Sequence, residues 1–192
     1  MSRIVAGAAG GTVLVSVPGD GTRPTTDRVK EALFSRLESM NMLSEVRVLD
    51  LYAGSGSLGV ESASRGAKSV ELVEFNDKAA AVCQRNAELV NKVLGTRTVT
   101  VQRSKVESFL ARADEAGVDQ WDLVFMDPPY PLTEAELSLV LGLLAPRLSS
   151  YGIVVVERSA RTPEPTWPPG LQLLAEKKYG ETRLWFAEPV GE

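Results

Sequence analysis

Short apolar runs alternate along the chain with stretches whose apolar residues recur every three or four positions. The runs predict strands at residues 46–51, 69–74, 98–102, 121–126 and 152–157. The stretches between them predict helices at residues 57–65, 77–92, 105–116 and 133–148. Strands that alternate with helices are typical of an α/β protein, so we expect a doubly wound, mostly parallel sheet.

Both ends of the chain depart from this alternation. Residues 3–6 and 12–17 enclose a segment rich in glycine and alanine and predict a β-hairpin, which a helix over residues 26–40 follows. Either Thr25 or Thr26 is placed to cap that helix. We therefore expect an N-terminal extension ahead of the main domain, with bounds at residues 1–40 and 41–192.

The C-terminal part begins with a loop, because the prolines between residues 158 and 170 rule out a helix. Strands at residues 171–178 and 183–187 then predict an antiparallel hairpin. Two tryptophans lie in this part, Trp167 in the loop and Trp185 in the last strand. Tryptophans can stack on nucleic-acid bases, but we expect these two to pack against the core or at its edge.

Length and composition indicate one compact domain. At 192 residues, with 44% hydrophobic and 24% charged residues, the chain can bury a full core but has no length for a separate target-recognition domain. The formal net charge of -4 argues against general affinity for nucleic acids. Any nucleic-acid contact must therefore come from a local basic patch.

The residue types present exclude several kinds of chemistry. Histidine is absent and Cys83 is the only cysteine, so we expect no disulfide, no Cys/His metal site and no histidine-dependent triad. Cys83 lies within a helical pattern, and we expect it in the core. No apolar run approaches the roughly 18 residues of a membrane span, and the first residues lack a signal-peptide pattern. We therefore expect a cytoplasmic protein without membrane contact.

A glycine-rich turn follows the first strand of the main domain. Residues 48–59 read Val-Leu-Asp-Leu-Tyr-Ala-Gly-Ser-Gly-Ser-Leu-Gly, a strand that runs into glycines and then a helix. Glycines let a ligand approach the backbone and let the helix pack closely on its strand. The acid that ends the second strand, Glu74, lies 74 − 54 = 20 residues after the first glycine, a spacing suited to binding ribose hydroxyls.

This spacing fits two ligands, a nicotinamide dinucleotide and S-adenosylmethionine. Asp50, at the end of the first strand, would repel a pyrophosphate but suits the ammonium and sulfonium side of S-adenosylmethionine. Phe75 is placed to pack on the adenine, and Asn76 offers an amide nearby. The predicted cofactor-binding residues are Asp50, Tyr52, Ala53, Gly54, Gly56, Glu74, Phe75 and Asn76.

The segment Asp127-Pro128-Pro129-Tyr130 follows the buried strand predicted at residues 121–126. Two prolines fix φ and remove N–H donors, so the chain must leave the sheet as a stiff loop at the edge where such sheets bind ligands. Asp127 and the Pro128 carbonyl are suited to accept the two N–H hydrogens of an exocyclic amine, and Tyr130 to stack on the base. We predict that Asp127, Pro128 and Tyr130 are catalytic in amine methylation, because hydride transfer gives this segment no evident task.

These motifs, in this order, resemble a Rossmann-type amino-methyltransferase. The segment Arg23–Phe34, together with Arg3–Gly7 and Tyr179–Trp185, is similar to the bacterial RsmD family, which methylates N2 of guanine 966 in 16S ribosomal RNA. The resemblance covers nearly the whole chain. It implies S-adenosylmethionine as methyl donor, and 16S rRNA in the small ribosomal subunit or its assembly intermediate as partner. We expect a monomer.

Two segments depart from the pattern of that family. Residues 8–12 read Ala-Ala-Gly-Gly-Thr, where members carry basic residues that would grip phosphate. Either contacts to ribosomal protein replace this phosphate binding, or other residues of the chain provide it. The candidates are Arg3, Arg23, Thr25, Thr26, Arg28, Lys30 and Arg36. The basic side chains of the helix are expected mostly off its apolar stripe. After the third strand the family often has an acid or amide, whereas this chain has Lys105-Val106, so we expect a backbone contact to the cofactor from Val106.

Other classes stay open. A DNA adenine or cytosine amino-methyltransferase would use the same Asp-Pro-Pro-Tyr segment, and duplex DNA would then accept the methyl group. A protein-glutamine methyltransferase usually has asparagine in place of Asp127, which lowers that alternative. A nicotinamide-dependent oxidoreductase, or a binding module without catalysis, would not bind S-adenosylmethionine.

Overall fold

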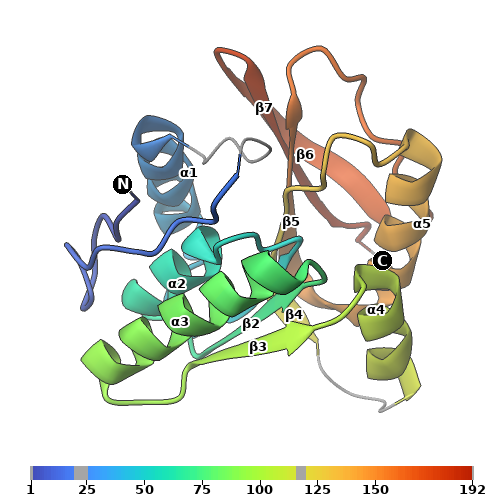
Figure 1. Ribbon diagram of the computed structural model, residues 1–192. Coiled ribbons are helices and arrows are strands. Elements are labelled where there is room, and N and C mark those ends of the chain that lie inside the picture. Colours follow the sequence, from blue (N-terminus) through green and yellow to red (C-terminus); the bar gives the residue numbers. More distant parts are fainter. Residues whose placement is uncertain (1, 20–25, 116–119, 192) are drawn as a thin grey trace.

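The computed structural model describes residues 2–19, 26–115 and 120–191, which form a seven-stranded sheet with helices on both faces (Figure 1). The strands are β1 (Arg47–Leu51), β2 (Ser69–Glu74), β3 (Val99–Arg103), β4 (Trp121–Met126), β5 (Leu148–Ser159), β6 (Leu171–Tyr179) and β7 (Thr182–Pro189). The helices are α1 (Asp27–Ser39), α2 (Ser57–Ser64), α3 (Asp77–Leu94), α4 (Val106–Glu115), α5 (Glu134–Leu144) and the 3-10 turn η1 (Ala145–Arg147). The predicted alternation of strands and helices is confirmed.

The strand order is β3-β2-β1-β4-β5-β7-β6. Strands β1 to β5 run parallel, whereas β7 pairs with both β5 and β6 in the antiparallel direction. The doubly wound sheet and the C-terminal hairpin are therefore both confirmed. The order reverses between β1 and β4, which is the place where open α/β sheets bind ligands, beyond the carboxyl ends of the strands.

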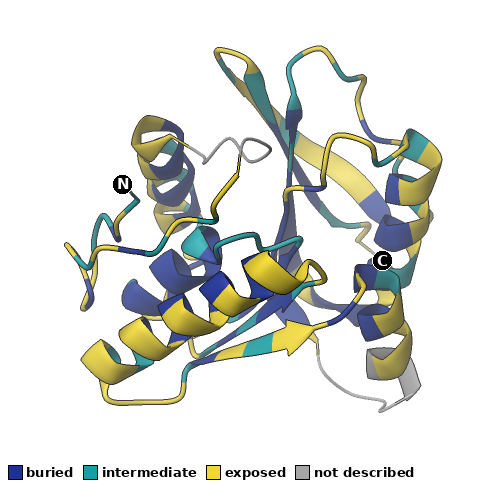
Figure 2. Ribbon diagram, viewed as in Figure 1, coloured by how far each residue is buried: buried dark blue, intermediate teal, exposed yellow. Residues whose placement is uncertain are grey.

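Alternating residues of each strand pack against different helices. Phe125 and Val155 belong to the apolar cluster shared with α1, α2 and α3, and Val124 and Val154 to the cluster shared with α4 and α5. Figure 2 accordingly shows the central strands buried between helices whose outer faces are exposed. Both faces of the central strands are thus covered, which explains why they read as continuous apolar runs.

Helix α2 lies unusually close to the sheet. A Cβ atom added at Gly59 would come within 2.2 Å of Leu72 Cδ2 on β2, so only glycine allows this approach. Gly56, which begins the helix, has a φ of 83° and would place a Cβ 2.8 Å from Leu72 Cδ1. The glycines of the turn therefore fix the position of α2 as well as the shape of the turn.

The predicted N-terminal hairpin forms only in part. One isolated antiparallel bridge joins Arg3 to Val13, and within residues 2–19 no regular strand develops on either side of it. The N–H groups of Ile4 and Leu14 donate across the hairpin to the carbonyls of Thr12 and Ser2 (both 2.9 Å). In the loop between them the donors turn to α2, where Ala8 N donates to the Ser64 carbonyl (2.8 Å) and Ala9 N to Ser64 Oγ (2.9 Å). Acceptors on α2 thus satisfy backbone donors of the loop.

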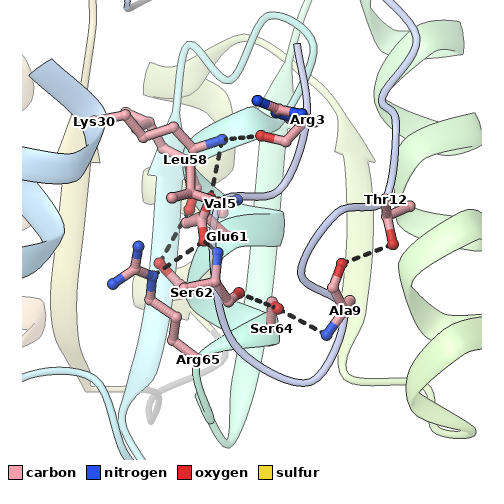
Figure 3. Close-up of polar contacts among 12 residues, drawn as sticks. Arg3, Val5, Ala9, Thr12, Lys30, Leu58, Glu61, Ser62, Ser64 and Arg65 are labelled. Atoms are coloured by element: carbon pink, nitrogen blue, oxygen red, sulfur yellow. Dashed lines mark hydrogen bonds and ion pairs between the residues drawn. The ribbon is translucent and has the colours of Figure 1, made fainter. Parts of the chain in front are cut away.

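A buried carboxylate, Glu61 of α2, joins the N-terminal segment to the body of the protein (Figure 3). Its oxygens accept the backbone N–H groups of Val5 (2.8 Å) and Ala6 (3.1 Å). Lys30 Nζ (3.1 Å) and Arg65 Nε (3.0 Å) complete the cluster, and Lys30 also donates to the Arg3 carbonyl. Burial raises the pKa of Glu61, but these donors outweigh it and hold the pKa below its ordinary value.

The structure corrects the prediction that Lys30 contacts RNA. Its side chain is 1% exposed and is committed to Glu61 and the Arg3 carbonyl. Lys30, Leu33, Phe34 and Leu37 follow the spacing of one helical face, so the lysine lies on the buried stripe of α1 rather than beside it. The buried carboxylate of Glu61, which faces that stripe, stabilises the charge there.

We expect Lys30→Met to lower the free energy of unfolding by about 3 kcal/mol, because Glu61 would stay buried with one cation fewer. Urea denaturation at neutral pH measures the change. Arg28→Met, an exposed position of the same helix, serves as the control and should change stability by less than about 0.5 kcal/mol. An equal loss in both variants would contradict the buried ion pair as a stabilising contact.

Candidate functional site

The carboxyl ends of neighbouring strands bring the two sequence motifs together. Strand β1 pairs with β2 and β4 on its two sides, with Leu51 opposite both Val73 and Met126. The glycine turn leaves β1 directly after Leu51, and the Asp-Pro-Pro-Tyr loop leaves β4 directly after Met126. Two loops that leave adjacent parallel strands at the same edge must begin side by side.

The glycine turn has a left-handed backbone at three positions. Tyr52 (φ 58°), Gly54 (φ 60°) and Gly56 (φ 83°) all lie in this region, which an aromatic residue such as Tyr52 seldom occupies. Space around Gly54 is open, with no atom within 4 Å of an added Cβ, so its backbone is accessible to a ligand. Strain at Tyr52 beside an accessible backbone is typical of a binding turn.

Glu74, at the end of β2, organises the backbone around this turn. One carboxylate oxygen accepts the N–H of Gly54 (2.8 Å), and the other accepts the N–H groups of Phe75 (3.1 Å) and Asn76 (3.0 Å). The half-buried carboxylate therefore joins the ends of β1 and β2 and retains lone pairs for further donors. The predicted end of the second strand at Glu74 is confirmed.

Asp50 and Cys83 lie beneath the turn. Asp50 is 3% exposed, and its Oδ2 accepts the N–H of Gly59 (3.0 Å). Burial raises the pKa of Asp50, the bond from Gly59 opposes this shift, and the charges of Glu74 and Glu157 add to it. Cys83 is buried in the core as predicted, with its sulfur 3.1 Å from the Gly54 carbonyl, and burial raises the pKa of its thiol. The thiol is therefore protonated and supports the turn.

The Asp-Pro-Pro-Tyr loop is anchored at its far end. Arg158, a buried residue of β5, donates to Glu134 Oε1 (2.7 Å) and to the Leu132 carbonyl (3.4 Å), just beyond the loop. A capping box between Thr133 and Glu136 then begins α5. Tyr130, in contrast, is 83% exposed, so its ring is available to a ligand.

Asp127 combines solvent contact with a perturbed pKa. Its side chain reaches solvent, yet dehydration by the surrounding protein raises its pKa well above the ordinary value. The charges of Glu157 and Asp50 raise the pKa further, and Arg158 opposes them. A carboxylate that three neighbours and the protein interior perturb in this way is typical of a functional site.

The remaining cofactor candidates lie around the ends of β2 and β3. Phe75 is 59% exposed, and Lys105 Nζ lies 5.3 Å from the centre of its ring. The Asn76 side chain caps α3 by accepting the N–H of Ala79 (3.1 Å), so its oxygen already has a structural role. Val106 is buried at the start of α4, and Ala53 N donates to the Val73 carbonyl.

Several of the predicted RNA contacts have other partners within the protein, and two lie outside the described residues. Arg23 and Thr25 lie outside the described residues, and Thr26 caps α1 by accepting the N–H of Val29. The guanidinium of Arg36 lies 4.9 Å from the centre of the Phe186 ring, on the core side of α1. The exposed basic side chains that remain are Arg3 and Arg28.

The two tryptophans are placed by packing. Trp185 is 3% exposed within the core, and Trp167 is half-buried against the same apolar cluster, with Nε1 2.9 Å from Glu164. Both positions confirm the expectation that they pack against the core.

Glu157 and Arg158, at the end of β5, are the site residues that the sequence analysis missed. Glu157 follows the apolar run 153–156 directly, as Asp127 follows its own strand. A charged residue directly after a buried apolar run was thus the signal that could have identified Glu157.

Among the described residues, no group of three or more potential ligands could hold a metal ion. No helix in this part of the chain is long and apolar enough to cross a membrane.

The reversed strand order, the glycine turn after β1 and the Asp-Pro-Pro-Tyr loop after β4 define a Rossmann-like fold of the S-adenosylmethionine-dependent methyltransferase class. A family model described as "Conserved hypothetical protein 95" matches residues 2–188. The chain belongs to this family, the RsmD family.

Curated relatives and solved structures agree with this assignment. Ribosomal RNA small subunit methyltransferase D of Haemophilus influenzae is 34% identical over 178 residues, which are 93% of this chain and 89% of the relative. The protein of the same name from Escherichia coli K12 is 32% identical, with 99% and 92% covered. The structure of a hypothetical protein from Thermus thermophilus has a TM-score of 0.81, at 30% identity, and covers 98% of this chain and 99% of its own.

The fold also occurs in more distant enzymes. The rRNA methyltransferase AviRa of Streptomyces viridochromogenes is 17% identical, and its structure has a TM-score of 0.73 over 94% of this chain and 91% of its own.

Asp127→Asn should raise the free energy of unfolding by about 0.5 kcal/mol at neutral pH, a small gain because solvent screens the charges. The raised pKa means that folding disfavours the ionised carboxylate, so the wild type loses stability as pH rises from about 4 through the folded pKa. Urea denaturation at pH 4.5 and 7.5 should show the gain growing with pH. Glu38→Gln, an exposed position of α1, is the control. A less stable asparagine variant at pH 7.5 would contradict the repulsion.

Proposed function

We propose that this protein is an S-adenosylmethionine-dependent methyltransferase that acts on ribosomal RNA of the small subunit. Its product would be a guanine methylated on the exocyclic N2, at position 966 of 16S rRNA. The observation that carries this proposal is the pairing of β1 with β4, which places the glycine turn beside the Asp-Pro-Pro-Tyr loop. A methyl group can pass directly between two ligands only if the sites that hold them are adjacent.

The residues of the β1 and β2 ends fit S-adenosylmethionine. The open space at Gly54 admits a ligand against the backbone, and the half-buried carboxylate of Glu74 is suited to the two ribose hydroxyls. The exposed ring of Phe75 offers a surface for the adenine, and Asp50 a negative charge for the cationic end. The walls of this site would come from Tyr52, Ala53, Gly56, Asn76 and the backbone of Val106.

S-adenosylmethionine, when bound, supplies a methyl carbon that a nitrogen lone pair can attack while the carbon–sulfur bond breaks toward sulfur. Asp127 and the Pro128 carbonyl would accept the two N–H hydrogens of the guanine amine, and so turn its lone pair toward the donor. Tyr130 would stack on the extruded base. The amine acquires a positive charge as it bonds to carbon, and Asp127 stabilises this charge and then accepts the released proton.

RNA binding in this scheme relies on few charges of the enzyme. Arg3, Arg28 and Thr26 of the described residues remain the proposed contacts, and Arg23 and Thr25 continue that stretch in sequence. A protein with so few phosphate contacts gains little sequence-independent affinity. We therefore infer that the cytoplasmic small subunit, or an assembly intermediate with its proteins in place, is a better substrate than naked RNA.

Transfer of a labelled methyl group tests the function and the catalytic role of Asp127 together. Unmodified 16S rRNA, assembled small subunits and duplex DNA are the acceptors, and mass spectrometry locates the product. We expect N2-methylguanine in the assembled particle, and at least about 1000-fold less with Asp127→Ala because the amine loses its acceptor. Cofactor affinity by calorimetry should stay within about threefold. Methylation of DNA alone would refute ribosomal RNA as the substrate. Loss of cofactor binding in the variant would refute the catalytic role of Asp127.

Glu74→Ala should weaken S-adenosylmethionine binding by about 10- to 100-fold, because two hydrogen bonds to a charged acceptor are lost. Turnover at saturating cofactor should fall much less than affinity does. Calorimetric titration measures the first effect and steady-state kinetics the second. Glu88→Ala, an exposed position of α3, is the matched control. Unchanged cofactor affinity in Glu74→Ala would remove this residue from the site.

A further inference from the structure

Glu157 lies beside Asp127 on the neighbouring strand. Strands β4 and β5 run parallel with Met126 opposite Val156, the last pair of their register, so Asp127 and Glu157 each directly follow one of these two paired residues. Neighbouring strands are about 4.8 Å apart, and residues at matched positions point to the same face. Val155, two positions earlier, packs toward α1, α2 and α3, which places Glu157 on that face as well.

The electrostatics agree with this placement. After dehydration, the charge of Glu157 is the largest cause of the raised pKa of Asp127, and it also contributes to that of Asp50. The interaction between two charges weakens as the distance between them grows. The next residue of β5, Arg158, is buried and binds Glu134 just beyond the Asp-Pro-Pro-Tyr loop. Successive residues of a strand point to opposite faces, so Glu157 and Arg158 serve different sides of the sheet.

The bases differ in the atom that lies beside the amine. In guanine the ring nitrogen N1 carries a hydrogen, so N1–H and the N2 amine form a row of donors. In adenine and cytosine the corresponding ring nitrogen carries a lone pair. Two adjacent carboxylates can each accept a hydrogen from guanine, whereas with adenine or cytosine the second carboxylate would face a lone pair and lose its partner.

We propose that Glu157 determines the specificity for guanine by accepting its N1–H, while Asp127 and the Pro128 carbonyl hold the N2 amine. This inference rests on the proposed function and adds a substrate-contacting residue to it. The half-buried position of Glu157 suits the role, because a carboxylate partly removed from water discriminates donors from acceptors more strongly than an exposed one does.

The test compares two acceptors, small subunits whose 16S rRNA carries either guanine or 2-aminopurine at the methylated position. 2-Aminopurine keeps the N2 amine but has a lone pair at N1. The wild type should prefer guanine by at least about 100-fold in kcat/KM. Glu157→Gln should reduce this preference by at least about tenfold, because the amide can donate a hydrogen to N1. 2-Aminopurine also lacks O6, but this difference affects both enzymes and cancels in the ratio of their preferences.

The matched control is Glu188→Gln, which should keep the wild-type preference. Glu188 lies on β7 far from Leu184, the residue of that strand that pairs with Glu157. Failure of the wild type to methylate guanine N2 would refute the proposed function. Methylation of guanine with no preference over 2-aminopurine would refute the role of Glu157 alone. A Glu157→Gln enzyme that is slower on both acceptors at an unchanged preference would also refute it. If that variant does not fold, the wild type alone still refutes the role of Glu157 when it shows no preference for guanine over 2-aminopurine.

Discussion

The parallel pairing of β1 with β4 is the contact on which the arrangement of the site depends. It aligns Leu51 with Met126, so the loops that follow them start at one edge of the sheet. Both strands are mostly apolar because both of their faces are covered, and their hydrogen-bonded register fixes where the next residues begin. The chemistry of the edge is thus set by which residue follows each buried strand.

Carboxylates follow or end several of these strands, and gathering them costs stability. Asp50 is repelled by Glu74, Glu157 and Asp127, Asp127 is also repelled by Glu157, and burial deprives Asp50 of water. The N–H of Gly59 and the guanidinium of Arg158 offset part of this cost. The remainder is consistent with a site that must receive a cationic donor and a hydrogen-rich base edge, since both supply positive partners for these carboxylates.

The sequence predicted most of the sheet, because buried parallel strands read as apolar runs and glycines mark the turn after β1. It also predicted that β2 ends at Glu74, because the apolar alternation of that strand stops there. Lys30 was placed wrongly, because its buried position follows from the carboxylate of Glu61 on another helix. The N-terminal hairpin was overestimated for a related reason, since its donors bind Glu61 and Ser64 more than 50 residues away. Contacts of this range leave no local pattern.

Helix α2 is only eight residues long, about 12 Å, and both of its ends bind other parts of the chain. Its first turn lies against Asp50 through Gly59, and its second half binds the N-terminal segment through Glu61 and Ser64. Deleting the N-terminal segment would expose the apolar cluster that Ile4 covers. It would also leave the buried carboxylate of Glu61 without its backbone donors. A truncated protein would therefore not separate the effects on RNA binding from those on binding of the methyl donor. An affinity tag is better attached to the C-terminus.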